Sequence, residues 1–277
     1  MKASPISDLS RLCIHTVTTK PWPIEEAAKN YSQLGVSGIS VWSDALEGRN
    51  AGQTGKMLRD CGLEVVSYVR GGFFPAAEAA DRLAAIDDNR KMIDEAAELG
   101  APLLVLVCGA VPGQSLALSR RQIEDGIAAI LPHAEQMGIR LGIEPLHPMY
   151  ADSRSAVNTL GQANDIAEKF ASRHLGVVID VYHLWWDPDL EEQISRCGKN
   201  GHLLAFHVCD WKTPTDDLLL DRGLMGEGCI NIKQIRGWVE SAGFKGFNEV
   251  EIFSSTYWQM DQKVFLDRIV EAYSHHV

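Results

Sequence analysis

Acidic side chains and a histidine interrupt apolar runs in the second half of the chain. A charged or polar group within an apolar strand costs free energy unless it is paired or binds a metal. Three carboxylates brought together around one imidazole would repel one another and require a cation. The residues concerned lie at or near the ends of four apolar runs: Glu144 in IRLGIE, Asp180 in LGVVID, His207 in LLAFHVCDW and Glu251 in FNEVEIF.

Two of these residues have simpler explanations when each is considered alone. Glu144 precedes Pro145 and is typical of a solvated carboxylate at the rim of a sheet, and His207 is typical of a hydrogen-bonded core imidazole. Four such residues at four successive strand ends favour a shared divalent cation. Oxygen-rich ligation with open positions suits Mn²⁺ or Mg²⁺, with Co²⁺ and Zn²⁺ as alternatives.

Strand-like and helical segments alternate along the whole sequence, a pattern typical of parallel strands joined by crossover helices. Apolar, β-branched runs predict eight strands at 12–18, 38–42, 63–69, 103–108, 139–145, 175–181, 203–209 and 246–253. Segments of helical period predict eight helices at 24–34, 52–61, 87–99, 120–137, 159–172, 188–199, 232–242 and 259–274.

These eight β/α units predict the α/β class and a single (β/α)₈ TIM barrel over residues 1–277, because no linker or change of composition divides the chain. A doubly wound open sheet is the alternative. In a barrel, the carboxyl ends of successive strands meet at one rim, where barrel enzymes carry their active sites. We therefore expect the four candidate ligands to converge at that rim.

Composition and charge exclude several classes of binding partner. The 277 residues include 26 Lys and Arg against 37 Asp and Glu, and the net charge of −11 argues against nucleic acid as the ligand. The longest apolar run, 101–111, is too short to cross a membrane, and residues 1–16 lack the apolar core of a secretory signal. The six cysteines form no C-x-x-C pair, so no thiolate zinc site is expected. We expect a cytoplasmic protein with no nucleic-acid or membrane partner.

The order and spacing of five motifs resemble the xylose isomerase-like barrel superfamily, specifically its sugar phosphate isomerase/epimerase group. The resemblance covers nearly the whole chain. The motifs are G-I-E-P at 142–145, D-x-x-H at 180–183, F-H-V-x-D at 206–210, R-G-x-x-G-E-G at 222–228 and V-E-I-F at 250–253.

The resemblance implies a role for each matching residue. Glu144, Asp180, His207 and Glu251 would ligate the metal. Glu144 and Glu251 would also act as acid and base on opposite faces of a bound sugar. His183 would contact a substrate oxygen, and Arg222 would reach the sugar from the loop after the seventh strand. The resemblance also points to a homo-oligomer.

Further candidates lie at the ends of the first three predicted strands. His15, Trp42 and Arg70 would line the pocket. Trp42 suits the face of a sugar and Arg70 a phosphate or carboxylate, although core packing and a neighbouring acid would explain them equally well. The long loop 211–231 is typical of a lid, and we expect it to fold over the bound sugar and bring Arg222 in.

The sequence leaves four functions open. A metal-dependent isomerase or epimerase of a keto-sugar or sugar phosphate would abstract the proton beside a carbonyl through a metal-stabilised enediolate. A lyase of the same barrel would start with that step and then eliminate water or an alcohol from a keto-inositol or 3-keto-glycoside. An abasic-site endonuclease would need an additional D-x-H pair, which the chain lacks. The fourth is a non-catalytic sugar-binding barrel with a structural ion.

Overall fold

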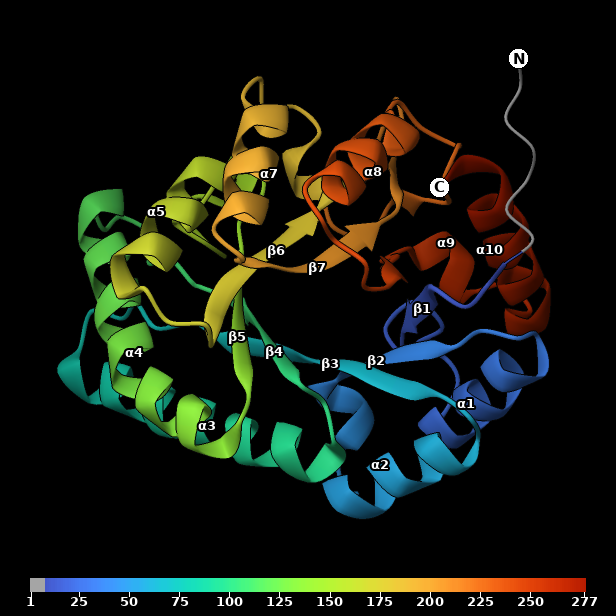
Figure 1. Cartoon of the computed structure of the whole chain (residues 1–277), viewed down its shortest axis with the longest axis horizontal. Coiled ribbons are helices and arrows are strands. Elements are labelled where there is room, and N and C mark those ends of the chain that lie inside the picture. Colours follow the sequence, from blue (N-terminus) through green and yellow to red (C-terminus); the bar gives the residue numbers. More distant parts are fainter. Residues whose placement is uncertain (1–7) are drawn as a thin grey trace.

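Eight parallel strands close into a barrel in the computed structural model, which describes residues 8–277. The last barrel strand pairs with both the first and the seventh, which closes the ring and excludes an open sheet. The predicted (β/α)₈ barrel is therefore confirmed. The ring, seen at the centre of Figure 1, runs through β1 (Leu12–His15), β2 (Gly38–Trp42), β3 (Glu64–Gly72), β4 (Leu103–Val107), β5 (Arg140–Glu144), β6 (Leu175–Asp180), β7 (Leu203–Val208) and β10 (Asn248–Val250).

Helices surround the strands and bury the outer faces of the barrel (Figure 1). Within residues 8–277, no helix is long and apolar enough to span a membrane. The long helices are α1 (Ile24–Gln33), α2 (Ala51–Asp60), α3 (Ala79–Leu99), α4 (Leu116–Met137), α5 (Leu160–Phe170), α7 (Leu190–Lys199), α8 (Ile232–Ser241) and α10 (Gln262–His276). The short ones are η1 (Ser43–Leu46), η2 (Pro148–Tyr150), α6 (Val181–Leu184) and α9 (Ser255–Trp258).

Several element boundaries differ from those predicted. Helix α3 begins at Ala79 and not at residue 87. The first turns were not predicted because they are largely exposed and show no apolar period, although their residues favour helix. Helix α4 begins at Leu116 and not at residue 120, after Ser115 caps it by accepting a hydrogen bond from the Leu118 amide. The first strand ends at His15, and regular pairing of the eighth covers only 248–250.

The barrel interior changes from apolar to polar along its strands. Val105, Val178 and Ala205 belong to an apolar cluster inside the ring. Side chains two apart on a strand share a face, so Asp180 and His207 follow Val178 and Ala205 into the interior at the carboxyl ends of their strands. The fold thus directs the polar side chains to the predicted rim.

A small hairpin lies in the loop after β7. Strands β8 (Asp210–Trp211) and β9 (Arg222–Gly223) pair antiparallel, with Trp211 opposite Arg222. The Arg222 amide also donates to the Phe253 carbonyl at 3.0 Å, which joins the hairpin to the segment after β10. The long loop is therefore partly ordered by backbone pairing, and this pairing fixes the position of Arg222.

Two helical glycines provide a matched test of how closely the outer layer packs. A Cβ added at Gly55 in α2 would lie 2.0 Å from the Leu99 carbonyl oxygen at the end of α3, whereas one added at the exposed Gly237 in α8 would meet nothing within 4 Å. We expect Gly55→Ala to lower the free energy of unfolding by about 1–3 kcal/mol. Gly237→Ala should raise it by about 0.5–1 kcal/mol. Urea denaturation measures both, and equal effects would contradict this packing.

Candidate metal centre

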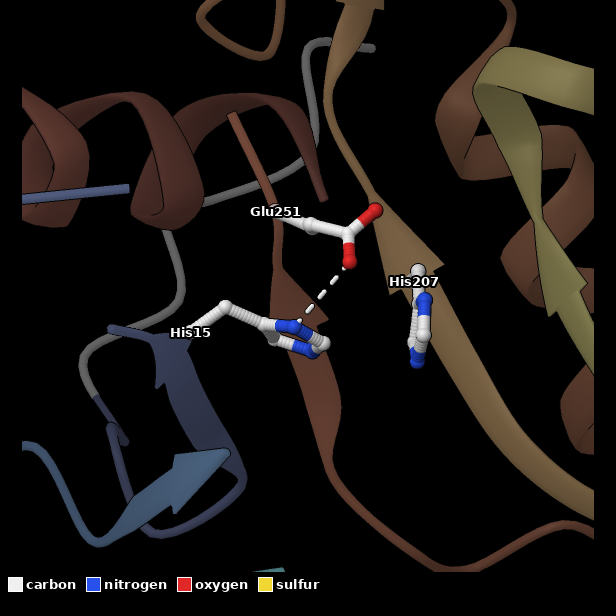
Figure 2. Close-up of side chains that lie close together, drawn as sticks. All are labelled: His15, His207 and Glu251. Carbon is white, nitrogen blue, oxygen red and sulfur yellow. Dashed lines mark ion pairs between the residues drawn. The ribbon is translucent and has the colours of Figure 1, made fainter. Parts of the chain in front are cut away.

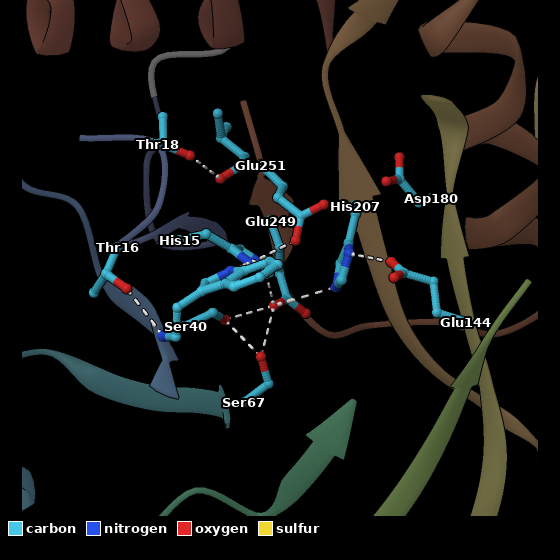
Figure 3. A network of polar contacts seen from close by, with 12 residues as sticks. His15, Thr16, Thr18, Ser40, Ser67, Glu144, Asp180, His207, Glu249 and Glu251 are labelled. Carbon is cyan, nitrogen blue, oxygen red and sulfur yellow. Dashed lines mark hydrogen bonds and ion pairs between the residues drawn. The ribbon is translucent and has the colours of Figure 1, made fainter. Parts of the chain in front are cut away.

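Four predicted ligands converge at the carboxyl end of the barrel. Glu144 ends β5, Asp180 ends β6, His207 lies in β7 and Glu251 follows β10 directly. One donor atom from each lies within 4.8 Å of the others, and all four residues are buried. Strand register explains part of this, since Asp180 pairs with His207 across β6 and β7. Figure 3 shows Glu144 and Asp180 on one side of the His207 ring and Glu251 on the other.

Buried polar atoms in this cluster lack hydrogen-bond partners. Both ring nitrogens of His207 and the Oε1 atom of Glu144 form no hydrogen bond within the described part of the chain. His207 Nδ1 and Glu144 Oε1 nevertheless face each other at 3.1 Å. Unpartnered buried groups are rare in proteins and call for an explanation. Donor atoms of three carboxylates and an imidazole, converging and incompletely satisfied, fit a divalent cation.

Arg222 contributes a positive charge to the cluster. Its Nη1 atom donates to Asp180 Oδ2 and to Glu251 Oε2, each at 2.9 Å, and the side chain is buried. The guanidinium thus bonds two of the candidate ligands, and the residue also lines the cavity described below, so a contact between Arg222 and the substrate stays a prediction. A carboxylate oxygen has two lone pairs, so these hydrogen bonds leave each oxygen able to bind a cation.

His183 lies beside this arginine. Arg222 Nη2 is 3.1 Å from His183 Nε2, and because a guanidinium only donates, Nε2 must accept. The ring proton then lies on Nδ1, which is buried and has no partner among the described residues. Burial and the charge of Arg222 lower the pKa of His183 well below its usual value. His183 is therefore a neutral imidazole with a free N–H donor.

His15 lies behind Glu251 and does not line the cavity. Its Nδ1 atom is 3.1 Å from Glu251 Oε1, and its Nε2 atom is 3.1 Å from Glu249 Oε2. The dashed line in Figure 2 marks the first of these two contacts. Glu249 also accepts a hydrogen bond of 2.6 Å from Ser40. Both ring nitrogens of His15 face buried glutamates, and a contact between His15 and the substrate stays a prediction.

Charge and burial together shift the pKa values of the cluster. Burial raises the pKa of Asp180 to about 7, against the opposing effect of Arg222. Burial alone would lower the pKa of His207, but the surrounding carboxylates, with Glu144 foremost, outweigh it and raise that pKa to about 10. His15 and Arg222 hold the pKa of Glu251 well below its usual range in spite of its burial. The carboxylates are therefore balanced by protonated groups when no cation is bound.

A small cavity adjoins the cluster. Its wall includes Glu144, His183 and Glu251, together with the predicted pocket residues Trp42 and Arg70. The cavity volume is about 30 Å³, enough for one or two water molecules, so any larger ligand must displace part of the wall.

The loop after β7 closes this cavity. Leu219 contributes to the wall, and the carbonyl of Leu218 accepts hydrogen bonds from Tyr150 at 2.6 Å and from Tyr182 at 2.9 Å. Two tyrosine hydroxyl groups thus hold the loop over the site. Whether it opens and closes with ligand, as a lid would, stays a prediction.

Comparison with known proteins identifies the family. The family model for the xylose isomerase-like TIM barrel matches residues 28–268. The chain belongs to the xylose isomerase-like TIM barrel family. An inosose isomerase of Halalkalibacterium halodurans is 25% identical over 212 residues, which cover 74% of this chain and 73% of that protein. A 3-dehydroshikimate dehydratase of Pseudomonas aeruginosa is 25% identical over 211 residues, covering 73% of this chain but 31% of the dehydratase.

Two solved structures are similar in fold to this xylose isomerase-like barrel. Protein SMc04130 from Sinorhizobium meliloti 1021 is 47% identical with a TM-score of 0.93, and the match covers 98% of this chain and 100% of that one. The IOLI protein with a bound zinc atom is 18% identical with a TM-score of 0.82, covering 96% and 99%. The second likeness concerns the fold alone.

Three features of the site escaped the sequence analysis. Glu249, two residues before Glu251, forms hydrogen bonds with His15 and Ser40 below the cluster, and nothing in the sequence indicated these bonds. Arg154, from the segment after η2, lines the cavity and was not singled out. Asp210 orders the loop that carries Arg222, and its position in the F-H-V-x-D motif was the available signal.

The Asp210 carboxylate provides a test of how the loop is held. It is fully buried and accepts hydrogen bonds from the amides of Trp211, Gly226 and Ile230 at 2.8, 2.9 and 3.0 Å. Asp210→Ala leaves these donors without a partner, so we expect a loss of about 3 kcal/mol or more in unfolding free energy. Limited proteolysis should also cut the loop faster.

The matched control is Asp217→Ala in the same loop. Asp217 is exposed, although it also accepts hydrogen bonds from two backbone amides. Its loss should cost less than about 1 kcal/mol, because water replaces the lost partner. Similar losses in the two variants would show that Asp210 does not hold the loop.

Proposed function

We propose that this protein is a divalent-metal-dependent isomerase or epimerase that acts on a small keto-sugar or sugar phosphate. The observation that carries the proposal is the convergence of Glu144, Asp180, His207 and Glu251 within 4.8 Å at the carboxyl end of the barrel. Active sites of such barrels occur at that end. Membership of the xylose isomerase-like family and the likeness to an inosose isomerase support it.

The donor set also supports a choice of metal. Carboxylate-rich sites suit Mn²⁺ or Mg²⁺, and Co²⁺ and Zn²⁺ are alternatives. The zinc bound by the IOLI protein, which shares this fold, supports a divalent cation without selecting one. A divalent cation held here would act as a Lewis acid that stabilises the negative charge developing on a substrate carbonyl oxygen.

The chain itself supplies the proton chemistry in this proposal. Glu144 and Glu251 flank His207 from opposite sides (Figure 3). One of these carboxylates removes the proton from the carbon beside the carbonyl, and the other returns a proton, which permits inversion at that carbon or transfer to the neighbouring one. The free N–H of His183 donates a hydrogen bond to a substrate oxygen. Arg222 and His15 position Glu251.

The second candidate is a lyase of the same barrel, which the likeness to a 3-dehydroshikimate dehydratase favours. The first step, removal of the proton beside a carbonyl, is common to both reactions. A lyase would then expel water or an alcohol from the β carbon. The glutamic acid formed in the first step would return its proton to the departing oxygen, while the N–H of His183 donates a hydrogen bond to that oxygen.

Deuterium exchange tests the proposed function and separates the two reactions. Incubation of the Mn²⁺-loaded protein with a panel of keto-sugars in D₂O should incorporate deuterium beside the carbonyl while the carbon skeleton and all oxygens are retained. Loss of water or alcohol from the substrate would instead select the lyase. Mass spectrometry and proton NMR measure both outcomes.

Two variants show whether the exchange belongs to the metal centre. Glu144→Gln removes a proposed base and should slow exchange by about 100- to 10,000-fold. Glu191→Gln changes an exposed acid on α7 and should exchange like the unmodified protein. If Glu144→Gln exchanged at the full rate, or no keto-sugar in the panel reacted in either way, the proposed function would be wrong.

A further inference from the structure

Two arginines besides Arg222 line the cavity. Arg70 follows Val69 near the end of β3, and Arg154 lies in the segment after η2. They contribute to the same wall as Glu144 and Glu251, two of the candidate ligands. Both arginines are partly exposed, whereas the two glutamates are buried. The arginines therefore belong to the more exposed part of the cavity wall, together with Trp42, Leu219 and Phe253.

Aromatic rings, and not acids, hold these two arginines. The Arg70 guanidinium lies 4.9 Å from the ring centre of Phe73 and 5.7 Å from that of Trp42, and the Arg154 guanidinium lies 5.6 Å from that of Tyr150. Within residues 8–277, neither side chain has a carboxylate within 4 Å or donates a hydrogen bond. A guanidinium stacked on a ring is held in place while its N–H donors stay free.

The electrostatic surroundings make this arrangement costly without a ligand. Burial and the nearby charge of Arg154 lower the pKa of Arg70, and more distant acids oppose this without forming an ion pair. Two like charges are thus held near each other in a partly desolvated wall. An anion between them would relieve the repulsion. The overall charge of −11 repels anions, so such a ligand would need a local positive site.

Arg222 does not offer this kind of site. Its guanidinium already bonds Asp180, Glu251 and His183. The two other arginines carry the unused donors, and planar guanidinium groups match the geometry of carboxylate and phosphate oxygens.

We infer that Arg70 and Arg154 form an anion subsite, and that the substrate carries a carboxylate or phosphate group in addition to its reacting carbonyl. The statement that the substrate reacts at a carbonyl rests on the proposed function. The statement that it carries an anionic group rests on the two arginines alone. It narrows the substrate class to acidic or phosphorylated keto-sugars and excludes neutral sugars as the preferred ligands.

Calorimetric titration of the Mn²⁺-loaded protein tests the subsite without requiring turnover. The probes are two matched pairs, D-fructose with D-fructose 6-phosphate and D-glucose with D-glucuronate, together with inorganic phosphate. The acidic member of at least one pair should bind about tenfold more tightly than its neutral partner, since charged hydrogen bonds are the strong ones. The pair that shows the preference distinguishes phosphate from carboxylate.

Arginine variants locate the preference. Arg70→Gln and Arg154→Gln should each lose about tenfold in affinity for the preferred acidic probe and leave the neutral partner unchanged. Arg70→Lys should restore part of the loss, because it keeps the charge. Arg173→Gln changes an exposed arginine in the turn between α5 and β6, before the amino end of a barrel strand. It is the charge-matched control and should bind like the unmodified protein. Thermal unfolding of each variant shows that it is folded.

Three outcomes would overturn the inference. They are equal binding of neutral and acidic probes, a preference that survives in both Gln variants, and no binding of any acidic probe or phosphate. If neutral keto-sugars still exchanged deuterium, the proposed function would stand while the subsite failed. If acidic probes bound through the two arginines and nothing exchanged, the subsite would stand and the proposed function would fail.

Discussion

Four buried carboxylates at one end of a single barrel impose the constraint on which the rest of the site depends. Glu144, Asp180, Glu249 and Glu251 are each at most 4% exposed, and carboxylates so buried require positive charge nearby. In the structure Arg222 and the imidazoles of His15 and His207 supply it. A bound cation would take over part of that role at His207 and Glu144, whose unpartnered atoms face each other.

The surrounding fold positions the buried carboxylates and the groups that balance their charge. Strand register places Asp180, His207 and Glu249 side by side on three neighbouring strands, so the cluster is as rigid as the barrel. The loop after β7 brings in Arg222, which bonds two of the carboxylates, and Asp210 fixes that loop through three backbone amides. Ser40 and His15 satisfy Glu249 below the cluster.

Much of this arrangement could be predicted from the sequence. Alternating strand and helix patterns fix the barrel, and a polar residue at the end of an apolar run indicates which strand ends carry ligands. The partners of Arg222 could not be predicted, because they depend on the path of a long loop. The contacts of His15 with the two glutamates could not be predicted either, because they depend on how deeply the first strand lies in the barrel. The early start of α3 gave no periodic signal, because the first turns face solvent.

The central claim is that these side chains share one divalent cation. Crystals of the protein loaded with Mn²⁺, measured at wavelengths above and below the manganese absorption edge, test this most directly. The account predicts one anomalous peak per chain, within bonding distance of Glu144, Asp180, His207 and Glu251. A map with no peak among these four residues, and with Arg222 still bonded to Asp180 and Glu251 in the presence of excess Mn²⁺, would contradict it.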